Sequence, residues 1–305
     1  MSTEGNAPAS GEATGLPQVP HRRRPRYAGK YPRKFAEKYK ELDPERHPDV
    51  VAKVLASGKT PAGTHRSILV TEVLDVLAPK AGERAVDCTL GYGGHSRELL
   101  ARLVPGGRLI GLDVDPLELP KTEARLRAAG FGPECFVAVR SNFAGLPRVL
   151  AEAGWDGADV ILADLGVSSM QLDDPGRGFT AKHAGPPDMR MNPGRGRSAG
   201  ALLASAKAAE LSRLLVENAD EPRADLLASA LAGRSFDTTR DLAEAIREVV
   251  GAVPREERET TVRRVFQALR IAVNEEFSAL DTLLRHLPDC LGPGGRVAVL
   301  TFHSG

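Results

Sequence analysis

The chain has 305 residues, of which 42% are hydrophobic and 27% charged, and its 41 basic and 40 acidic side chains leave a net charge of +1. This composition is typical of a soluble enzyme with a well-buried core, and the charge balance excludes a global attraction to nucleic acid. The N-terminus has no apolar run that would serve as a signal peptide, and no run of about eighteen apolar residues predicts a membrane span. We therefore expect a cytoplasmic protein that does not contact membranes.

The three cysteines are spread along the chain at Cys88, Cys135 and Cys290. They form no CxxC motif and no Cys/His cluster of the kind that holds a structural zinc ion. The sequence therefore predicts neither a metal site nor a disulfide framework, and it favours a reducing compartment.

Residues 1–60 are predicted to be a basic N-terminal extension without a fixed fold. Seven Lys or Arg and two tyrosines, but no acid, lie between Arg22 and Lys34, in a stretch that also contains Pro and Gly. Such a composition is typical of a solubilising tail, but it also suits an arm that contacts RNA phosphates. The sequence leaves both interpretations open.

Short apolar strands alternate with helical segments through most of the remaining chain. We predict strands at 84–87, 108–113, 135–140, 159–164 and 296–302, with a first helix over 64–77. This alternation favours an α/β fold with a parallel sheet and helices on both of its faces. Ligands bind beyond the carboxyl ends of the strands in such a sheet, and Asp87, Asp113 and Asp164 fall there. Asp is also a common helix cap, which is the competing explanation.

The segment after the first strand predicts a cofactor-binding turn. Gly91, Gly93 and Gly94 permit a sharp turn and a close ligand approach, and the following helix offers free N–H groups. Asp113 follows Gly93 by twenty positions, which suits an acid that accepts hydrogen bonds from ribose hydroxyls. Dehydrogenases show the same pattern, so an NAD-type oxidoreductase remains an alternative at this point.

The fourth strand ends at Asp164, and small residues that can line a pocket for a planar group follow it. Ser168 and Ser169 have no nucleophile elbow and no evident His/Asp partners, so covalent hydrolysis is not favoured. His95, directly after the glycine turn, either caps the helix or contacts the cofactor. By spacing alone it is not a catalytic base.

A long interruption separates the fourth and fifth strands. Residues 171–197 are rich in Gly, Pro and Arg and read as a loop, and helical patterns follow, so we treat 172–260 as an inserted helical subdomain. A long amphipathic helix over 261–287 is expected to pack back on the sheet. Whether its Arg263, Arg264 and Arg270 are solvated or contact RNA stays open.

A dense set of motifs resembles one known family. The motifs are His65–Leu74, Asp87–Ser96, Asp113–Pro116, Asp164–Asp173, Arg177–Phe179, Gly185–Met191, Arg263–Ile271 and Thr301–Ser304. In this order they resemble the MraW/RsmH family of S-adenosylmethionine-dependent methyltransferases, which act on cytidine N4 of small-subunit (16S) ribosomal RNA. The match spans residues 65 to 304, and nothing that matches is visible before about residue 60.

The resemblance implies a class I methyltransferase fold, Rossmann-like, formed by residues 61–171 and 261–305, with the insertion helping to bind RNA. It also implies S-adenosylmethionine as the cofactor, no metal, and 16S rRNA within the small ribosomal subunit as the partner. The cofactor-binding residues that it implies are Gly93, Gly94, His95, Asp113, Phe143, Asp164 and Gln171. We add the hypothesis that Asp164 is catalytic and that either its carboxylate or the backbone carbonyls of residues 164–166 accept a hydrogen bond from the target amine.

The chain also departs from the family pattern. Ala184, Pro187 and Asn192 stand where the family usually has Asp, Leu and Asp, so two possible acidic contacts are lost. The sequence ends at Gly305, whereas family members continue with a further charged segment. If that segment is absent, a weakly active RNA-binding ribosome-assembly factor is a second alternative function.

Overall fold

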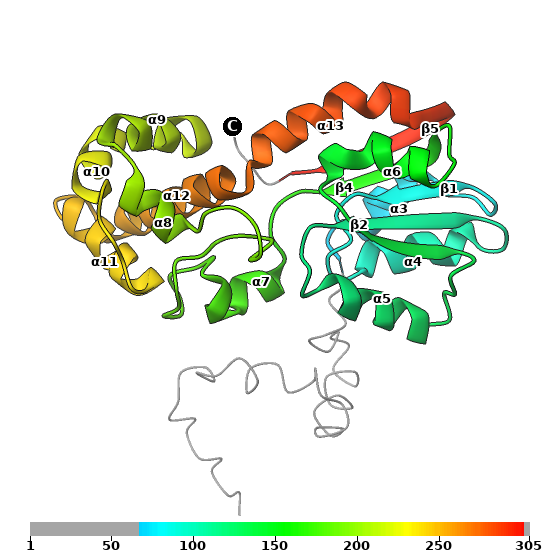
Figure 1. Cartoon of the computed structure of the whole chain (residues 1–305), viewed down its shortest axis with the longest axis horizontal. Coiled ribbons are helices and arrows are strands. Elements are labelled where there is room, and N and C mark those ends of the chain that lie inside the picture. Colours follow the sequence, from blue (N-terminus) through cyan, green and yellow to red (C-terminus); the bar gives the residue numbers. More distant parts are fainter. Residues whose placement is uncertain (1–66, 302–305) are drawn as a thin grey trace, which may run out of the picture. The chain divides into compact units, whose positions relative to one another are not determined.

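The computed structural model of the chain describes residues 67–301 (Figure 1). The basic stretch between Arg22 and Lys34 lies outside the described residues, as do His303 and Ser304. Five parallel strands form one sheet in the order β3-β2-β1-β4-β5. The strands are β1 (Arg84–Asp87), β2 (Arg108–Asp113), β3 (Phe136–Arg140), β4 (Ala158–Asp164) and β5 (Leu291–Leu300). The predicted α/β class with a parallel sheet is confirmed.

Helices cover both faces of the sheet because successive strand residues point in opposite directions. On one face, Ala85 and Leu162 pack with helices α3 (Val70–Leu77), α4 (Gly94–Leu103) and α5 (Leu119–Ala128). On the other face, the neighbouring residues Val86 and Ile161 pack with α6 (Leu146–Glu152) and α13 (Glu276–Cys290). These two clusters hold the strand ends in place, and the turns after β1, β2 and β4 meet at the same edge.

Two predicted elements have different bounds in the structure. Helix α3 begins only at Val70, after Leu69 in the left-handed region (φ 50°), so Ile68 and Leu69 are exposed and are not part of a buried helical face. Strand β5 runs from Leu291 to Leu300, whereas we expected a strand over 296–302. Leu291 pairs with Ala158, and the ladder resumes at Arg296 with a register shift between Ala158 and Val160. The glycine-rich segment is therefore an irregularity inside the strand.

The inserted helices have a hydrophobic core of their own. They are α8 (Ala199–Ser205), α9 (Ala208–Ala219), α10 (Ala224–Leu231), α11 (Thr239–Val249) and α12 (Arg255–Asn274). Buried residues of this cluster include Leu203, Leu215, Leu227, Ile246 and Val265. Figure 1 shows α8 to α11 grouped around α12. Between β4 and α8 lie the short helices α7 (Ser169–Asp173) and η3 (Pro175–Arg177), followed by an irregular segment as predicted.

The single helix predicted over 261–287 is wrong. The chain forms two helices, α12 and α13, which are separated at Glu275 by a left-handed backbone conformation (φ 52°). Val262, Phe266 and Leu269 of α12 pack with the inserted helices, and only α13 packs on the sheet. The apolar pattern continues through the break, so the periodicity could not reveal it. The proposed domain boundary at 261 remains a prediction, and this packing favours a boundary near Asn274. No helix within residues 67–301 combines the length and apolarity that crossing a membrane requires.

The break at Glu275 leads to a stability prediction. Glu275 is exposed and holds a conformation that costs a side-chain-bearing residue about 1 kcal/mol but suits glycine. We expect Glu275→Gly to raise the free energy of unfolding by about 1 kcal/mol, measured by urea denaturation. Ala272→Gly, inside α12, should lower it by about 1 kcal/mol. A loss of stability in both variants would contradict this account of the break.

Candidate active site

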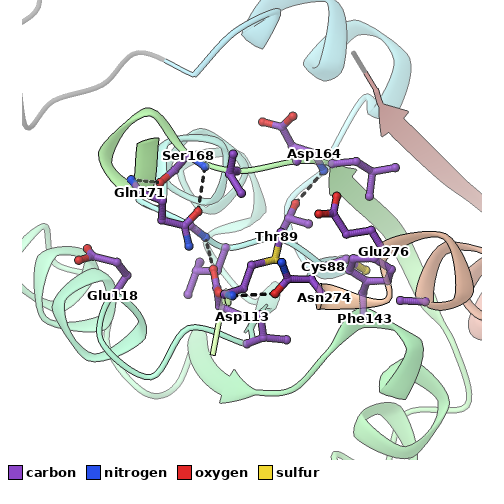
Figure 2. Close-up of a pocket in the computed structure, with 18 of the residues that line it drawn as sticks. Cys88, Thr89, Asp113, Glu118, Phe143, Asp164, Ser168, Gln171, Asn274 and Glu276 are labelled. Carbon is purple, nitrogen blue, oxygen red and sulfur yellow. Dashed lines mark hydrogen bonds between the residues drawn. The ribbon is translucent and has the colours of Figure 1, made fainter. Parts of the chain in front are cut away.

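A cavity of about 700 Å³ lies at the carboxyl ends of β1, β2 and β4 (Figure 2). All seven residues expected to contact a cofactor line it: Gly93, Gly94, His95, Asp113, Phe143, Asp164 and Gln171. Residues from the α12–α13 junction, including Arg270, Asn274 and Glu276, line it as well. The structure thus brings the predicted residues together, and their individual roles remain predictions.

The glycine turn requires residues without a Cβ because of its backbone conformation and its packing against α5. Gly93 has φ 82°, and a Cβ there would lie only 2.8 Å from Cγ2 of Thr122, so a larger residue would both strain the backbone and clash. The Gly91 N–H donates to Oδ2 of Asp113 (2.8 Å), and the Thr122 hydroxyl donates to the Gly91 carbonyl (2.5 Å). Helix α4 begins at Gly94 without a side-chain cap, which leaves its first N–H groups for a polar ligand.

Asp113 sits at the end of β2 with both carboxylate oxygens already bound to the backbone. Oδ1 accepts a hydrogen bond from the Asp115 N–H (2.8 Å), and Oδ2 accepts the bond from Gly91. Burial raises the pKa of Asp113 to about 6, against the lowering effect of these two bonds. A carboxylate has further lone pairs, so Asp113 can still accept from ligand hydroxyls in the cavity.

The ends of β1 and β4 are joined by a short polar chain. The Thr89 hydroxyl accepts a hydrogen bond from the Asp164 N–H (2.7 Å), as Figure 2 shows, and the Thr89 N–H donates to Asp87 (3.1 Å). Asp87 is almost fully buried and also accepts from the Ser96 hydroxyl (2.7 Å). Burial raises the pKa of Asp87. Asp87 therefore fixes the glycine turn and α4 to β1, and Thr89 links this unit to the backbone of Asp164.

His95 and Asp164 lie close together in the cavity. The Nε2 atom of His95 lies 3.0 Å from the carbonyl oxygen of Ile68, and Nδ1 lies 3.6 Å from Oδ2 of Asp164. Because a carbonyl only accepts, Nε2 must carry a proton, and Nδ1 therefore faces the carboxylate. Burial raises the pKa of Asp164; the charge of His95 opposes this shift and that of Asp87 adds to it. His95 does not cap α4 with its side chain.

Gln171 lines the cavity, but its amide is already used on both sides. Its oxygen accepts from the Ser168 N–H (3.0 Å) in a capping box at the start of α7, and its nitrogen donates to Oδ2 of Asp115 (2.9 Å). Ser168 is the N-cap of α7 and accepts from the Gln171 N–H (3.2 Å). The hydrogen bonds of Ser168 and Gln171 thus position the start of α7. A contact of Gln171 with a cofactor would be additional to these bonds.

A buried ion pair that the sequence did not indicate joins the two sides of the site. Nη1 of Arg177 donates to Oδ2 of Asp115 (2.7 Å), and both side chains are over 90% buried. Nη2 of Arg177 donates to the carbonyls of Arg190 (3.1 Å) and Met191 (2.8 Å). Both residues lay within recognised motifs, but nothing in their spacing indicated a contact between them. This pair attaches the irregular segment after α7 to the loop that carries Asp113.

Asn274 is a second residue that sequence reasoning missed. Its amide nitrogen donates to the Met189 carbonyl (2.7 Å), and its oxygen accepts from the Met191 N–H (2.7 Å). Met189 is fully buried in a left-handed conformation (φ 61°), which is strained for a non-glycine residue. Asn274 therefore clamps the segment around Met189 against α12. It lies only three positions beyond the motif that ended at Ile271, so a longer motif would have included it.

Arg270 and Glu276 form an ion pair that faces the cavity. Nε of Arg270 donates to Oε1 of Glu276 (2.8 Å), and Nη2 donates to Oε2 (2.9 Å). Their side chains are 22% and 17% exposed. For Arg270, the interpretation as a solvated surface residue is therefore wrong, whereas Arg263 is exposed and donates to Thr260.

The described part of the chain contains no candidate site for a metal ion. Among residues 67–301, no group of three or more His, Cys, Asp or Glu side chains is arranged to hold a metal ion. Cys88, Cys135 and Cys290 are all free and buried. What the cavity offers is a glycine turn, the uncapped start of a helix and acidic side chains, and this set suits an organic ligand with hydroxyl and carboxylate groups.

The comparison with known families decides the family. The MraW methylase family matches residues 62–305, which is most of the chain. The chain belongs to the MraW methylase family. Ribosomal RNA small subunit methyltransferase H 1 of Lachnoclostridium phytofermentans is 46% identical over 305 residues, covering 97% of this chain and 83% of that relative. The protein of the same description from Agathobacter rectalis is 47% identical over 294 residues, covering 93% of this chain and 84% of that relative.

The relatives also extend the similarity beyond what the motifs indicated. A match over 97% of this MraW methylase must include most of the first 60 residues, so the expectation that nothing matches there is wrong for such relatives. Ribosomal RNA small subunit methyltransferase H of Rubrobacter xylanophilus is 42% identical over 259 residues and covers only 80% of this chain. The N-terminal extension is therefore shared with some relatives, and the family match itself begins at residue 62.

The Arg177–Asp115 pair in this methylase gives a second stability prediction. Removing one partner of a buried ion pair leaves an uncompensated charge, which costs about 3 kcal/mol. We expect Arg177→Ala to lower the free energy of unfolding by about this amount. Arg148→Ala is the control, because Arg148 and Glu152 form a 3.9 Å pair with both side chains over 60% exposed, and this change should cost less than about 0.5 kcal/mol. Equal losses in urea denaturation would contradict the importance of the buried pair.

Proposed function

We propose that this chain transfers a methyl group from S-adenosylmethionine to the N4 amine of a cytidine in small-subunit ribosomal RNA. Family membership supports methyl transfer, and the names of the relatives support the RNA substrate. The observation that carries the proposal is the cavity in which the glycine turn, Asp113 and Asp164 converge. We place the protein in the cytoplasm, with the small ribosomal subunit as its partner and without a metal.

The cavity fits S-adenosylmethionine on chemical grounds. Gly91 and Gly93 line the cavity with their backbone, and the uncapped start of α4 would hold the amino-acid carboxylate. Asp113 would accept from the ribose hydroxyls, and Phe143 would pack beside the adenine. When bound, the cofactor supplies an activated methyl group on a sulfonium. The same turn would suit a dinucleotide, but membership in a methylase family favours methyl transfer over oxidoreduction.

Asp164 has the properties needed to assist an amine nucleophile. The lone pair of the cytosine N4 amine is delocalised into the ring, so the site must hold the amine in line and accept its protons as it pyramidalises. The Asp164 carboxylate faces the cavity with its side chain 28% exposed. Its raised pKa makes it a stronger proton acceptor than an ordinary carboxylate. The target base would have to leave its stack to reach this pocket.

His95 would support this role through its Nδ1 atom, which can share the proton that Asp164 accepts. Because Nε2 lies against the Ile68 carbonyl, Nδ1 is the ring nitrogen that faces the Asp164 carboxylate, 3.6 Å away. In the tautomer that carries its proton on Nε2, Nδ1 can share a proton that Asp164 takes from the amine. The proton leaves the reacting nitrogen without having to reach bulk water during transfer.

Substitution of Asp164 tests the proposed chemistry. The purified chain would be incubated with tritium-labelled S-adenosylmethionine and undermethylated small subunits, and the RNA nucleosides analysed. We expect label in N4-methylcytidine and a loss in kcat of about 100-fold or more for Asp164→Asn, because the amide cannot accept the proton. Cofactor affinity, measured by calorimetry, should change by less than about tenfold.

Glu118→Gln is the matched control for this experiment, since Glu118 also lines the cavity but has no proposed part in transfer. Its kcat should stay within about twofold of the wild-type value. Full activity of Asp164→Asn would contradict the proposed role. Cofactor binding by the wild-type chain without any transfer to subunits would favour the alternative of an RNA-binding assembly factor.

The pKa of Asp113 gives a pH prediction for cofactor binding. The ionised carboxylate accepts from the ribose, and its pKa is about 6, so the accepting form is lost as the pH falls through this value. We expect the Kd for S-adenosylmethionine to be about tenfold higher at pH 5 than at pH 7.5. Asp113→Asn should bind weakly at both pH values and show little pH dependence. A constant Kd for the wild-type chain would show that Asp113 does not titrate in binding.

A further inference from the structure

We propose that the Arg270–Glu276 pair recognises the Watson–Crick edge of the cytosine that is methylated. This inference rests on the proposed function and deepens it, because it names the residues that select the base. Arg270 is the only Lys or Arg among the described residues that line the cavity. Figure 2 shows Glu276 among the side chains around the pocket.

The geometry of the pair leaves one edge of the guanidinium available. Glu276 is bound through Nε and Nη2 of Arg270, which is the side edge of the planar group. No residue among 67–301 forms a hydrogen bond with Nη1 of Arg270. Nη2 carries a second N–H, which Glu276 does not use. The end edge of the fork can therefore donate two parallel hydrogen bonds to a second planar acceptor. Glu276 fixes the plane in which those donors lie.

Cytosine presents the acceptors that this fork requires. Its O2 and N3 atoms are adjacent acceptors, and its N4 amine is the donor for which Asp164 is the proposed acceptor. Uracil has an N3–H donor and an O4 acceptor at the corresponding places. The N3–H of uracil would face the N–H donors of Arg270, and its O4 acceptor would face the Asp164 carboxylate. Neither contact could form a hydrogen bond, so the same two residues would reject uracil.

Neighbouring residues make this end of the cavity suitable for a base. Gln267 lies one helical turn before Arg270, lines the cavity and has no hydrogen-bond partner among the described residues. Phe277 and Leu280 of α13 also line it and offer apolar contact to a planar ring. The glycine turn, Asp113 and Phe143 come instead from the segments after β1, β2 and β3. Helix α13 packs against the short helix η2 (Phe143–Gly145), so the residues proposed for the base adjoin Phe143.

A merely structural function is the competing explanation, because the pair also bridges the break at Glu275. The test therefore uses a substrate change together with a protein change. Arg270→Lys keeps the charge but loses the fork, and we expect kcat/KM on small subunits to fall at least 50-fold while the Kd for S-adenosylmethionine changes less than twofold. Subunits reconstituted with 3-deazacytidine at the target position lack the N3 acceptor and should slow the wild-type chain at least tenfold. They should slow Arg270→Lys no further.

Two additional variants test whether the loss of kcat/KM is specific to the Arg270–Glu276 pair. Glu276→Gln keeps the shape of the pair but weakens its hold on the guanidinium, so it should show an intermediate loss in kcat/KM with unchanged cofactor binding. Arg285→Lys is the control, since Arg285 lies on α13 in an exposed pair with Asp281, and its kcat/KM should stay within twofold of the wild-type value.

The outcomes separate this inference from the proposed function. If the wild-type chain methylates cytidine but Arg270→Lys retains its activity, base recognition by the pair is contradicted alone. The same holds if 3-deazacytidine slows Arg270→Lys as much as it slows the wild-type chain, because the pair would then be structural. If the wild-type chain methylates no subunit, the proposed function and this inference both fail.

Discussion

The arrangement of the site depends on the ion pair and the hydrogen bonds of the buried Asp115 carboxylate. It accepts hydrogen bonds from Arg177 and Gln171 as well as from the backbone of Leu117 and Glu118. Its own N–H donates to Asp113, so the same short loop fixes the acid at the end of β2. Because a buried ion pair loses its hydration, it is tolerated only when its remaining hydrogen-bonding groups are satisfied. Asp115 meets this condition and thereby links the end of β2 to the segments after β4.

The acidic residues at the strand ends differ in their hydrogen bonds and in their access to the cavity because their surroundings differ. Asp87 is enclosed and bound by Ser96 and the Thr89 backbone, so it serves the turn. Asp113 and Asp164 keep access to the cavity, where burial raises the pKa of each. A parallel sheet gathers such residues at one edge, and the local hydrogen bonds then decide which of them is left for a ligand.

The left-handed residue Glu275 shapes the other side of the cavity. By ending α12 and starting α13 in a new direction, it lets one helix pack with the inserted helices and the next one pack on the sheet. It also places Arg270 before the break and Glu276 after it, close enough to pair. Asn274, directly before the break, clamps the strained backbone at Met189. One backbone conformation thus positions several lining residues at once.

The sequence by itself determined the features that arise from local patterns. Alternating apolar strands, the glycine turn and the acids at Asp87, Asp113 and Asp164 predicted the sheet and its ligand-binding edge, because period, turn chemistry and strand ends are encoded by neighbouring residues. Only the tertiary structure decided the break at Glu275, the pairing of Arg177 with Asp115 and that of Arg270 with Glu276. The break does not interrupt the apolar pattern that periodicity reads. The two pairs depend on how the chain folds between their partners, which no spacing in the sequence indicates.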